Sequence, residues 1–388
     1  MSTTGRAPTD ADAASDIAAQ LREAGFVRLF ANADGDSLAA SGVLARALDD
    51  RSSPFQVSVV ETREAYARRR DRLNDETLVV SVGIGAEGST AETAPTIRAT
   101  DRPASVTAFD VARELGSTAD AVLALAGAAS SETVGAGETA PLLEAARENG
   151  VERRPGVGSP VDDLSDGLAH STLFHAPFSG DPGAVQAALA EIDLPAELDA
   201  DAYRRVASLV ALDATDVGTA DVRAAEAIER ALSPHAIPDG PFSTVEGYAD
   251  VLSAVACDAP GTGIALALGY EARADALSAW RSHAAGAHEG LRDGTTGRYD
   301  GLFVARVDDA PVRTTARLLR EYRSPEPVAM VVSDDEAGVT AADDSGVDRA
   351  LERAVAEIGG EFAGTSQRGY ARFDGDTKAF IAAFREAL

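Results

Sequence analysis

One stretch constrains the fold of this chain more than any other, the run from Val27 to Ala40. A short apolar segment ends at Phe30, an Asn/Asp/Gly-rich turn follows, and small residues at helical spacing begin at Ser37. This order of strand, polar turn and helix start is typical of an α/β protein whose binding site lies beyond the carboxyl end of a strand. We therefore expect the functional site at this turn.

The turn resembles the first motif of the DHH phosphoesterases, the superfamily of the RecJ exonucleases, in which His-x-Asp-x-Asp-Gly is followed by small residues. Alignment on Asp34-Gly35 places Phe30 at the family's His and Asn32 at its first Asp. In that family these side chains hold divalent metal, usually manganese. The resemblance implies the fold, and the substitutions predict that the metal site is lost. Asp34 is interpreted either as a vestigial ligand position or as a helix cap.

Short apolar strands alternate with helices in the first half of the chain. Strands are expected at 27–30, 55–60, 77–82 and 104–110, and helices at 17–24, 37–48, 61–72, 119–131 and 138–149. This alternation predicts a doubly wound parallel sheet. By the resemblance, Gly83 stands where the third strand delivers an Asp ligand. The family is named after an Asp-His-His motif. The best alignment places that motif on Ala108, Phe109 and Asp110.

In the second half of the chain, the sequence pattern changes from a loop-like region to helices and then to alternating strands and helices. Residues 151–181 are a long Gly/Pro/Ser/Asp-rich region without a clear pattern, which is typical of functional or mobile loops. Helices are expected at 185–192, 202–212, 221–232, 248–256 and 264–292, and then strands at 301–307, 328–333 and 369–373 with helices at 312–322, 347–358 and from 377. We predict a disordered lead (1–15), a DHH-like α/β domain (16–181), a helical connector (182–293) and a smaller α/β module (294–388).

The last module resembles the DHH-associated C-terminal module, which binds substrate strands in the nucleases. Its signature loop is Gly-Gly-x-x-Gly-Gly-His, and Thr365 stands here at the position of the His. The glycines permit a tight turn, and the same freedom suits a phosphate cradle. Guanidinium groups suit phosphate oxygens, and Arg320 shares a helix face with two of the expected contacts. The predicted nucleic-acid-binding residues are Gly359, Gly360, Gly364, Thr365, Arg313, Arg317, Arg368 and Arg372, with Phe362, Tyr370 and Phe373 as nearby stacking partners.

The side chains expected for a two-metal hydrolase are mostly missing, because paired cations need several Asp and His ligands. No metal cofactor is therefore expected. The alternative is a rearranged Mn²⁺ or Mg²⁺ site drawn from Asp34, Asp110, Asp162, Asp163 and His170, although Asp-rich clusters are more often solvated turns. His283 and His288 are five residues apart on an expected helix and are interpreted as surface residues.

Acidity pervades the chain, whose formal charge is −28 from 63 acidic and 35 basic residues, and Lys378 is the only lysine. Such diffuse acidity suggests adaptation to high internal salt, so it says little about partners. The cluster Arg68–Arg70 with Arg72 is interpreted as a charged helix face, and nucleic-acid contact is the alternative. No apolar run approaches the roughly 20 residues that span a bilayer, and a cytoplasmic location is expected. The single cysteine, Cys257, excludes an intramolecular disulfide.

These observations predict a RecJ-like protein that has lost its metal ligands and acts as a binding or scaffolding subunit in DNA replication or repair. Single-stranded DNA or RNA is the expected ligand. The resemblance to the RecJ-descended subunit of the replicative helicase implies the MCM ring and the GINS complex as partners. The alternative is an active Mn²⁺-dependent single-strand exonuclease or small phosphodiester hydrolase. A weaker third interpretation is a regulatory protein that binds a nucleotide.

Overall fold

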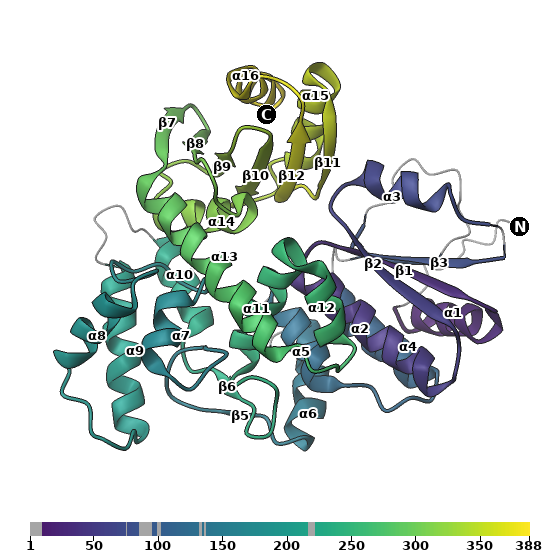
Figure 1. Ribbon diagram of the computed structural model, residues 1–388, viewed down its shortest axis with the longest axis horizontal. Helices are drawn as coiled ribbons and strands as arrows, with labels where there is room; N and C mark the ends of the chain where they lie inside the picture. Colours follow the sequence, from purple (N-terminus) through teal and green to yellow (C-terminus); the bar gives the residue numbers. More distant parts are fainter. Residues whose placement is uncertain are drawn as a thin grey trace, which may run out of the picture.

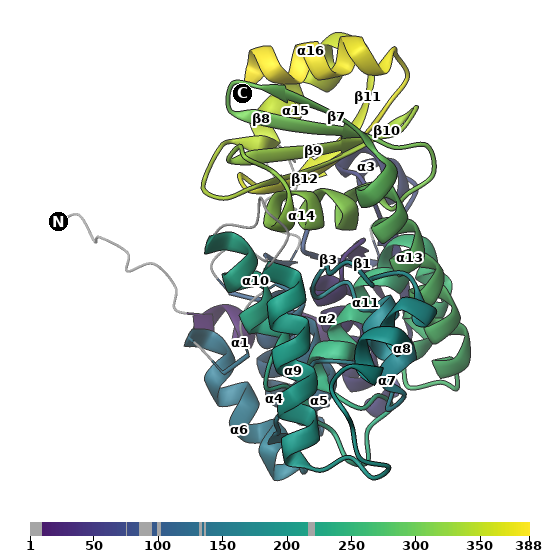
Figure 2. The same ribbon diagram turned by 90° about the vertical axis from the view of Figure 1, so that its left-hand side faces the viewer.

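The computed structural model describes residues 10–74, 76–84, 95–98, 102–131, 134–135, 137–215 and 222–388. An N-terminal lobe, a helical middle region and a C-terminal module follow one another along the chain (Figure 1). The view turned by 90° shows the C-terminal module seated above the helices of the other two parts (Figure 2). Among the described residues, no helix is both long and apolar enough to cross a membrane.

A four-stranded parallel sheet organises the N-terminal lobe, in the order β2-β1-β3-β4. Its strands are β1 (Val27–Asn32), β2 (Phe55–Val60), β3 (Leu78–Val82) and β4 (Thr96–Ile97). Successive side chains of a strand point to opposite faces. Leu29 of β1 accordingly joins the main core of the lobe, whereas Phe30 packs against Tyr66 of α3 (Arg63–Arg70). Helices thus cover both faces of the sheet, as the doubly wound prediction requires.

The other helices of this lobe correct two expectations. They are α1 (Asp10–Glu23), α2 (Gly35–Asp50), α4 (Ala104–Glu114), α5 (Ala121–Ala129) and α6 (Ala140–Glu148), the last preceded by a 3₁₀ turn at Gly137–Thr139. Residues 10–15, predicted to be disordered, belong to α1, while residues 1–9 lie outside the described part. Residues 104–110, predicted as a strand, form α4 instead, because its apolar residues bury one face against α2 and α5.

The middle region is mostly helical and contains two short strands. Its elements are β5 (Glu152–Arg153), α7 (Leu164–His170), α8 (Pro182–Ala190), α9 (Ala200–Thr215), α10 (Val222–Ala231), β6 (His235–Ala236), α11 (Val245–Asp258), α12 (Pro260–Ala267) and α13 (Arg273–Asp293). The loop prediction for 151–181 missed α7, which is capped by Asp163. The single helix expected at 264–292 is divided, since Gly269 takes a φ of 86° that ends α12.

The C-terminal module contains a six-stranded sheet in the order β11-β12-β10-β9-β8-β7, antiparallel except for the parallel pair β8 and β9. Its elements are β7 (Thr295–Tyr299), β8 (Leu302–Arg306), α14 (Val312–Tyr322), β9 (Val328–Val332), β10 (Glu336–Ala341), α15 (Val347–Ile358), β11 (Gly360–Gly364), β12 (Arg368–Phe373) and α16 (Thr377–Ala387). Three of these strands, β7, β10 and β11, were missed from the sequence. Helices α15 and α16 cover one face, and α14 covers the other.

Apolar packing divides the molecule differently from the chain order. One core joins the N-terminal sheet and its helices to α11, α12 and the first half of α13. A second core joins α7, α8, α9, α10 and the end of α13 to α14 and one face of the C-terminal sheet. The C-terminal module is therefore fixed to the middle region by buried apolar side chains.

Candidate functional site

In the first-motif turn, residues 32–37, Asp34 accepts its hydrogen bonds from within the turn, whereas the buried Asp36 accepts from the backbone N–H groups of Ala104 and Ser105 at 2.6 and 2.9 Å. Asp34 is the N-cap of α2 and accepts from the Ser37 backbone N–H at 2.7 Å and from the Ser37 hydroxyl at 3.0 Å. The Asn32 amide donates at 2.6 Å to Asp34 Oδ2, the oxygen that also accepts from the Ser37 hydroxyl. Of the two interpretations of Asp34, the helix cap describes its contacts.

Little space remains around this turn. A Cβ atom added at Gly83 would lie 1.9 Å from the Ser37 hydroxyl oxygen and 3.3 Å from Asn32 Cβ. On the outer side, Arg313 of α14 donates to the Ala33 carbonyl at 2.7 Å. The C-terminal module thereby places a guanidinium group against the turn that the sequence marks as the site.

The residues proposed for the alternative metal site each make their own contacts with other residues. Asp110 pairs with Arg102 at 2.6 Å, and Asp162 accepts from Ser243 at 2.6 Å. Asp163 caps α7, and His170 Nδ1 lies 3.0 Å from Asp166. Within the described ranges, no group of three or more His, Cys, Asp or Glu side chains is arranged to hold a metal ion.

The register proposed for the third motif is wrong, because Ala108, Phe109 and Asp110 lie within α4. The strand that actually precedes α4 is β4, which ends at Ile97. The segment between the end of this strand and the start of α4, where the family has its third motif, is therefore residues 98–103. Residues 99–101 of that segment lie outside the described part of the chain.

The predicted glycine loop is a β-hairpin rather than an open loop. A Cβ at Gly360 would lie 2.2 Å from the Arg372 carbonyl oxygen, and one at Gly364 would lie 2.6 Å from that of Arg368. These glycines permit the close approach of β11 to β12. Thr365 accepts from the Arg368 backbone N–H at 3.2 Å and so closes the hairpin. The expected stacking rings, Phe362, Tyr370 and Phe373, are buried.

Three of the four predicted arginines are engaged within the protein. Arg313 stacks on the Tyr370 ring at 3.9 Å, in addition to its bond to Ala33. Arg317 donates to Glu321 at 2.9 Å and to the Thr172 carbonyl at 2.6 Å. Arg372 pairs with Glu336 at 2.6 Å. The fourth, Arg368, makes no side-chain hydrogen bond or ion pair with any residue in the described ranges.

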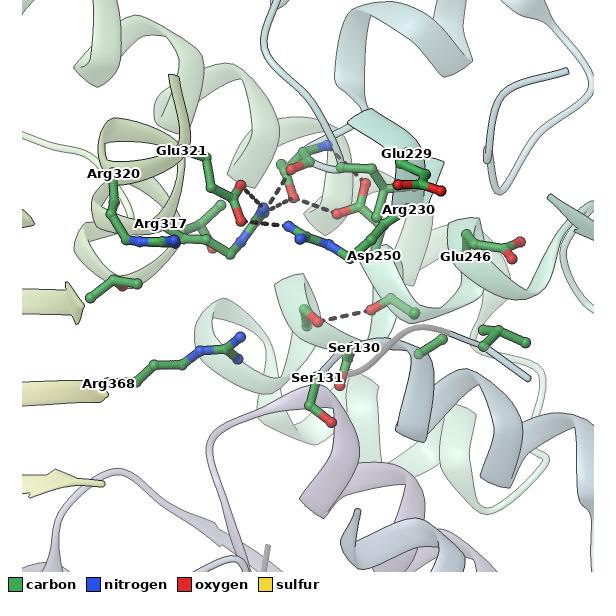
Figure 3. A pocket seen from close by; sticks show the side chains of 18 of the residues that line it. Ser130, Ser131, Glu229, Arg230, Glu246, Asp250, Arg317, Arg320, Glu321 and Arg368 are labelled. Carbon is green, nitrogen blue, oxygen red and sulfur yellow. Dashed lines mark hydrogen bonds and ion pairs between the residues drawn. The ribbon is translucent and has the colours of Figure 1, made fainter. Parts of the chain in front are cut away.

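Arg368 projects into a cavity of about 360 Å³ between the C-terminal module and the other two parts (Figure 3). The walls come from α5, α10, α11, α14 and the ends of β10 and β12. We call it the arginine cleft, after the five arginines that line it. They are Arg153, Arg230, Arg317, Arg320 and Arg368.

Arg320 shares the unpaired state of Arg368. Its Nε is buried and has no hydrogen-bond partner among the described residues. Desolvation, with Arg223 and Arg230 nearby, lowers the pKa of Arg320. Desolvation also lowers the pKa of Arg368, together with the charges of Arg317 and Arg230. Arg320 is half-buried and Arg368 is exposed to solvent, and neither guanidinium makes a side-chain hydrogen bond or ion pair among the described residues.

The carboxylates of the cleft cannot supply that anion, because three are already occupied. Asp250 accepts from Trp280 Nε1 at 2.8 Å and from the Thr172 backbone N–H at 2.9 Å. Glu246 is held by His235, and Glu321 by Arg230 and Arg317. The fourth, Glu229, is exposed to solvent. The cleft therefore has chemistry suited to an anionic ligand.

Behind the wall of the cleft lies a buried histidine pair, which corrects the surface interpretation of His288. The Nδ1 atoms of His175 and His288 are 3.1 Å apart, and His288 Nε2 lies 3.0 Å from the Ser171 carbonyl. His288 Nε2 donates to that carbonyl, so His175 Nδ1 donates to His288 Nδ1. Burial lowers the pKa of His175 to about 3 and that of His288 to about 4. His283 is buried too, between Asp258 and Thr314 at 2.8 Å each.

Sequence reasoning missed Arg153 and Arg230, which approach the cleft from the middle region. Arg153 lies in the 151–181 region that the sequence marks as a functional or mobile loop, but nothing local links it or Arg230 to Arg368, and only the tertiary fold brings them together. Arg320 did carry a signal, because it follows Arg313 and Arg317 at helical spacing on α14.

Comparison with known proteins finds a relative that matches this chain over its whole length. The chain is 51% identical over 392 residues to the uncharacterized protein rrnAC1427 of Haloarcula marismortui, and the match covers 100% of both chains. The chain belongs to the rrnAC1427 family. The model of the rrnAC1427 C-terminal domain also matches residues 294–386.

Solved structures place this rrnAC1427-family chain among RecJ-like folds. CDC45 from Entamoeba histolytica has a TM-score of 0.62 at 9% identity, over 97% of this chain and 99% of that one. RecJ from Thermus thermophilus, in complex with Mn²⁺, has a TM-score of 0.50 at 13% identity, over 99% of this chain and 55% of that one. At such identities the likeness shows the fold alone, which is the RecJ-like DHH fold expected from the first motif.

Proposed function

We propose that this protein binds single-stranded nucleic acid in the arginine cleft and does not hydrolyse it, acting as a binding or scaffolding subunit in DNA replication or repair. The observation that carries the proposal is the pair Arg320 and Arg368: the Arg320 Nε is buried without a hydrogen-bond partner, and the exposed Arg368 guanidinium faces the cleft without a hydrogen bond or ion pair among the described residues. Phosphodiester oxygens are the anions that guanidinium groups bind best in nucleic acids.

The non-hydrolytic part of the proposal rests on the first-motif turn. A two-metal mechanism needs several ligands to hold two cations about 3.5–4 Å apart. Asp34 is the one carboxylate that the first motif retains, and its oxygens accept from Ser37 and Asn32. A carboxylate that caps a helix in this way has little capacity left for a cation pair.

The proposed role among partners follows from the fold neighbours. CDC45 is the neighbour with the higher TM-score of the two, and its chain has nearly the same extent as this one. By that likeness we propose that the partners include the MCM helicase and the GINS complex. Arg313, Arg317 and Arg372 would then support the cleft from within, and Arg368, with Arg320, would contact phosphate directly.

The deciding experiment incubates the full chain with labelled single-stranded DNA or RNA in molar potassium chloride, with and without Mn²⁺ or Mg²⁺. We expect binding without cleavage. Replacing Arg320→Ala together with Arg368→Ala removes two charged contacts of about 1.5–3 kcal/mol each, so affinity should fall about 100-fold or more. Arg349→Ala on the exposed side of α15 serves as the matched control and should bind normally.

Two outcomes contradict the proposal. Metal-dependent degradation that Asp34→Ala abolishes would favour the alternative, an active exonuclease or phosphodiesterase with an unconventional ligand set. Binding that the Arg320→Ala, Arg368→Ala variant leaves unchanged would remove the arginine cleft as the binding site.

A further inference from the structure

Aromatic side chains are scarce in this chain, and most of them are buried. The sequence has 12 Phe, 7 Tyr and 1 Trp, and all of these residues lie in the described ranges. The rings that are not buried belong to elements away from the arginine cleft, and none of them lines it. They are Phe26, Phe55, Tyr203, Tyr270, Tyr299 and Phe303.

The lining of the arginine cleft contains no Phe, Tyr or Trp among the described residues. Its one ring is the imidazole of His235, which is buried and whose Nδ1 lies 2.8 Å from Glu246. Tyr370, which the sequence predicts as a stacking partner, is buried and is covered by the Arg313 guanidinium at 3.9 Å from the ring centre. The cleft therefore gives a nucleic-acid base no aromatic face on which to stack.

Charged nitrogen donors take the place of rings in this lining. The guanidinium groups of Arg317 and Arg230 are fixed by Glu321, at 2.9 and 2.6 Å. Arg320 and Arg368 project into the same space from α14 and β12 (Figure 3). The Nε of Arg320 has no hydrogen-bond partner among the described residues. Guanidinium groups of this kind suit the oxygens of a phosphodiester.

We propose that the arginine cleft binds the sugar–phosphate backbone of a single strand and makes no stacking contact with its bases, so that a strand without bases binds as well as one that carries them. This inference rests on the proposed function and narrows its ligand. Proteins that bind single strands without sequence preference combine phosphate contacts with stacking of bases on aromatic rings. Because the cleft lacks the rings, the phosphate contacts must supply the affinity.

The size of the cleft agrees with this kind of contact. Its volume of about 360 Å³ lies near the lower end of the range for pockets that enclose a small ligand, about 300–1,000 Å³. It therefore has room for a short piece of one strand.

The charge of the whole chain also favours direct contacts. A formal charge of −28 repels a nucleic acid at long range, but in molar salt the Debye length is only about 3 Å. Under those conditions the distant carboxylates are screened, and hydrogen-bonded pairs between guanidinium and phosphate persist because they are closer than this screening allows.

The deciding experiment changes the ligand and leaves the protein as it is. Fluorescence anisotropy in molar potassium chloride compares labelled strands of equal length. They are oligo-dT, oligo-dA, a strand of abasic tetrahydrofuran units, and an oligo-dT with uncharged methylphosphonate linkages. We expect the first three to bind with equal affinity. The methylphosphonate strand keeps every base and loses every backbone charge, so it should bind about 100-fold more weakly or worse.

The salt dependence of binding locates these contacts in the cleft. For single strands, each neutralised phosphate contributes about 0.7 to the slope of log affinity against log salt concentration. Replacing Arg320→Ala together with Arg368→Ala should therefore reduce this slope by about 1.4, and by the same amount for oligo-dT and for the abasic strand. Arg349→Ala, on the exposed side of α15, is the control and should keep the slope of the unmodified chain.

Three outcomes contradict the inference, and they separate it from the proposed function. An abasic strand that binds about fivefold or more weakly than oligo-dT would reveal at least one stacking contact. A methylphosphonate strand that binds as tightly as oligo-dT would show that the bases carry the affinity. Either result overturns the backbone contact and leaves single-strand binding in place. Failure of every strand to bind would remove the proposed function and this inference together.

Discussion

The first-motif turn and the arginine cleft are the two polar centres of this molecule, and they differ in how their charges are satisfied. At the turn, every oxygen of Asp34 has a donor within the chain. In the cleft, the Arg320 Nε and the Arg368 guanidinium donate to no acceptor among the described residues. A site whose polar groups satisfy one another has nothing left for a ligand, whereas unsatisfied cations mark a place where a ligand adds stability. The comparison separates a structural turn from a candidate binding site.

The largest effect should come from filling the turn further. Gly83→Ala adds a Cβ 1.9 Å from the Ser37 hydroxyl at a φ of 70°, so we expect a loss of about 3 kcal/mol in the free energy of unfolding. Gly116→Ala has the same kind of φ, 81°, but no atom within 4 Å, and should lose about 1 kcal/mol. Urea denaturation measures both. Equal losses would mean that the turn has room for a ligand.

Neighbouring arginines of α14 should respond with opposite signs. Arg317→Met removes charged hydrogen bonds to Glu321 and to Thr172 and should lower the free energy of unfolding by about 2 kcal/mol. Arg320→Met removes a buried, unpaired Nε and should raise it by about 1 kcal/mol. Thermal unfolding of the unliganded protein is the measurement. A loss of stability in both variants would show that Arg320 has a partner after all.

Acid should destabilise the fold through the buried histidine pair. His175 and His288 are neutral in the fold, with pKa values of about 3 and 4, and an unfolded histidine titrates near about 6.5. Their contribution to stability is therefore complete above about pH 6.5 and is lost as the pH falls toward about 4, by up to about 1.4 kcal/mol per pH unit for each imidazole. Arg292 and Arg323 nearby act in the same direction.

Urea denaturation at pH 7 and pH 5 tests this dependence. The variant His175→Gln, His288→Gln removes both titrating groups and should show a flatter profile than the unmodified chain, because all other groups are shared. Identical profiles in the two proteins would place the acid sensitivity elsewhere.

Patterns within a single element were readable from the sequence. The strand at 55–60 and the helices at 312–322 and 347–358 have the bounds that periodicity predicts. The first motif also led to the correct α/β class and to the RecJ-like fold. These features depend on neighbouring residues alone, which is the information that hydrophobic spacing carries.

Features that depend on tertiary contacts were not readable. Residues 104–110 contain β-branched residues that suit a strand, yet packing against α2 makes them a helix. The glycines at 360 and 364 suggest a phosphate loop, and in the structure they permit the close approach of two strands. The arginine cleft combines residues from the middle region with residues of the C-terminal module, so no local pattern could predict its full set.

The smallest effect should come from Asp34, the residue that the sequence marks most strongly. Asp34→Ala removes the N-cap of α2 and should cost about 1 kcal/mol in the free energy of unfolding, the usual value for a lost cap. A residue that only caps a helix should leave the response to Mn²⁺ unchanged, so excess Mn²⁺ should shift the melting temperature equally in the variant and in the unmodified chain. Asp34→Asn preserves an acceptor for the Ser37 N–H and serves as the control. A Mn²⁺-dependent stabilisation that disappears in both variants would make Asp34 a metal ligand. The turn would then bind a ligand, as the cleft is proposed to do, and the two regions would no longer differ in this respect.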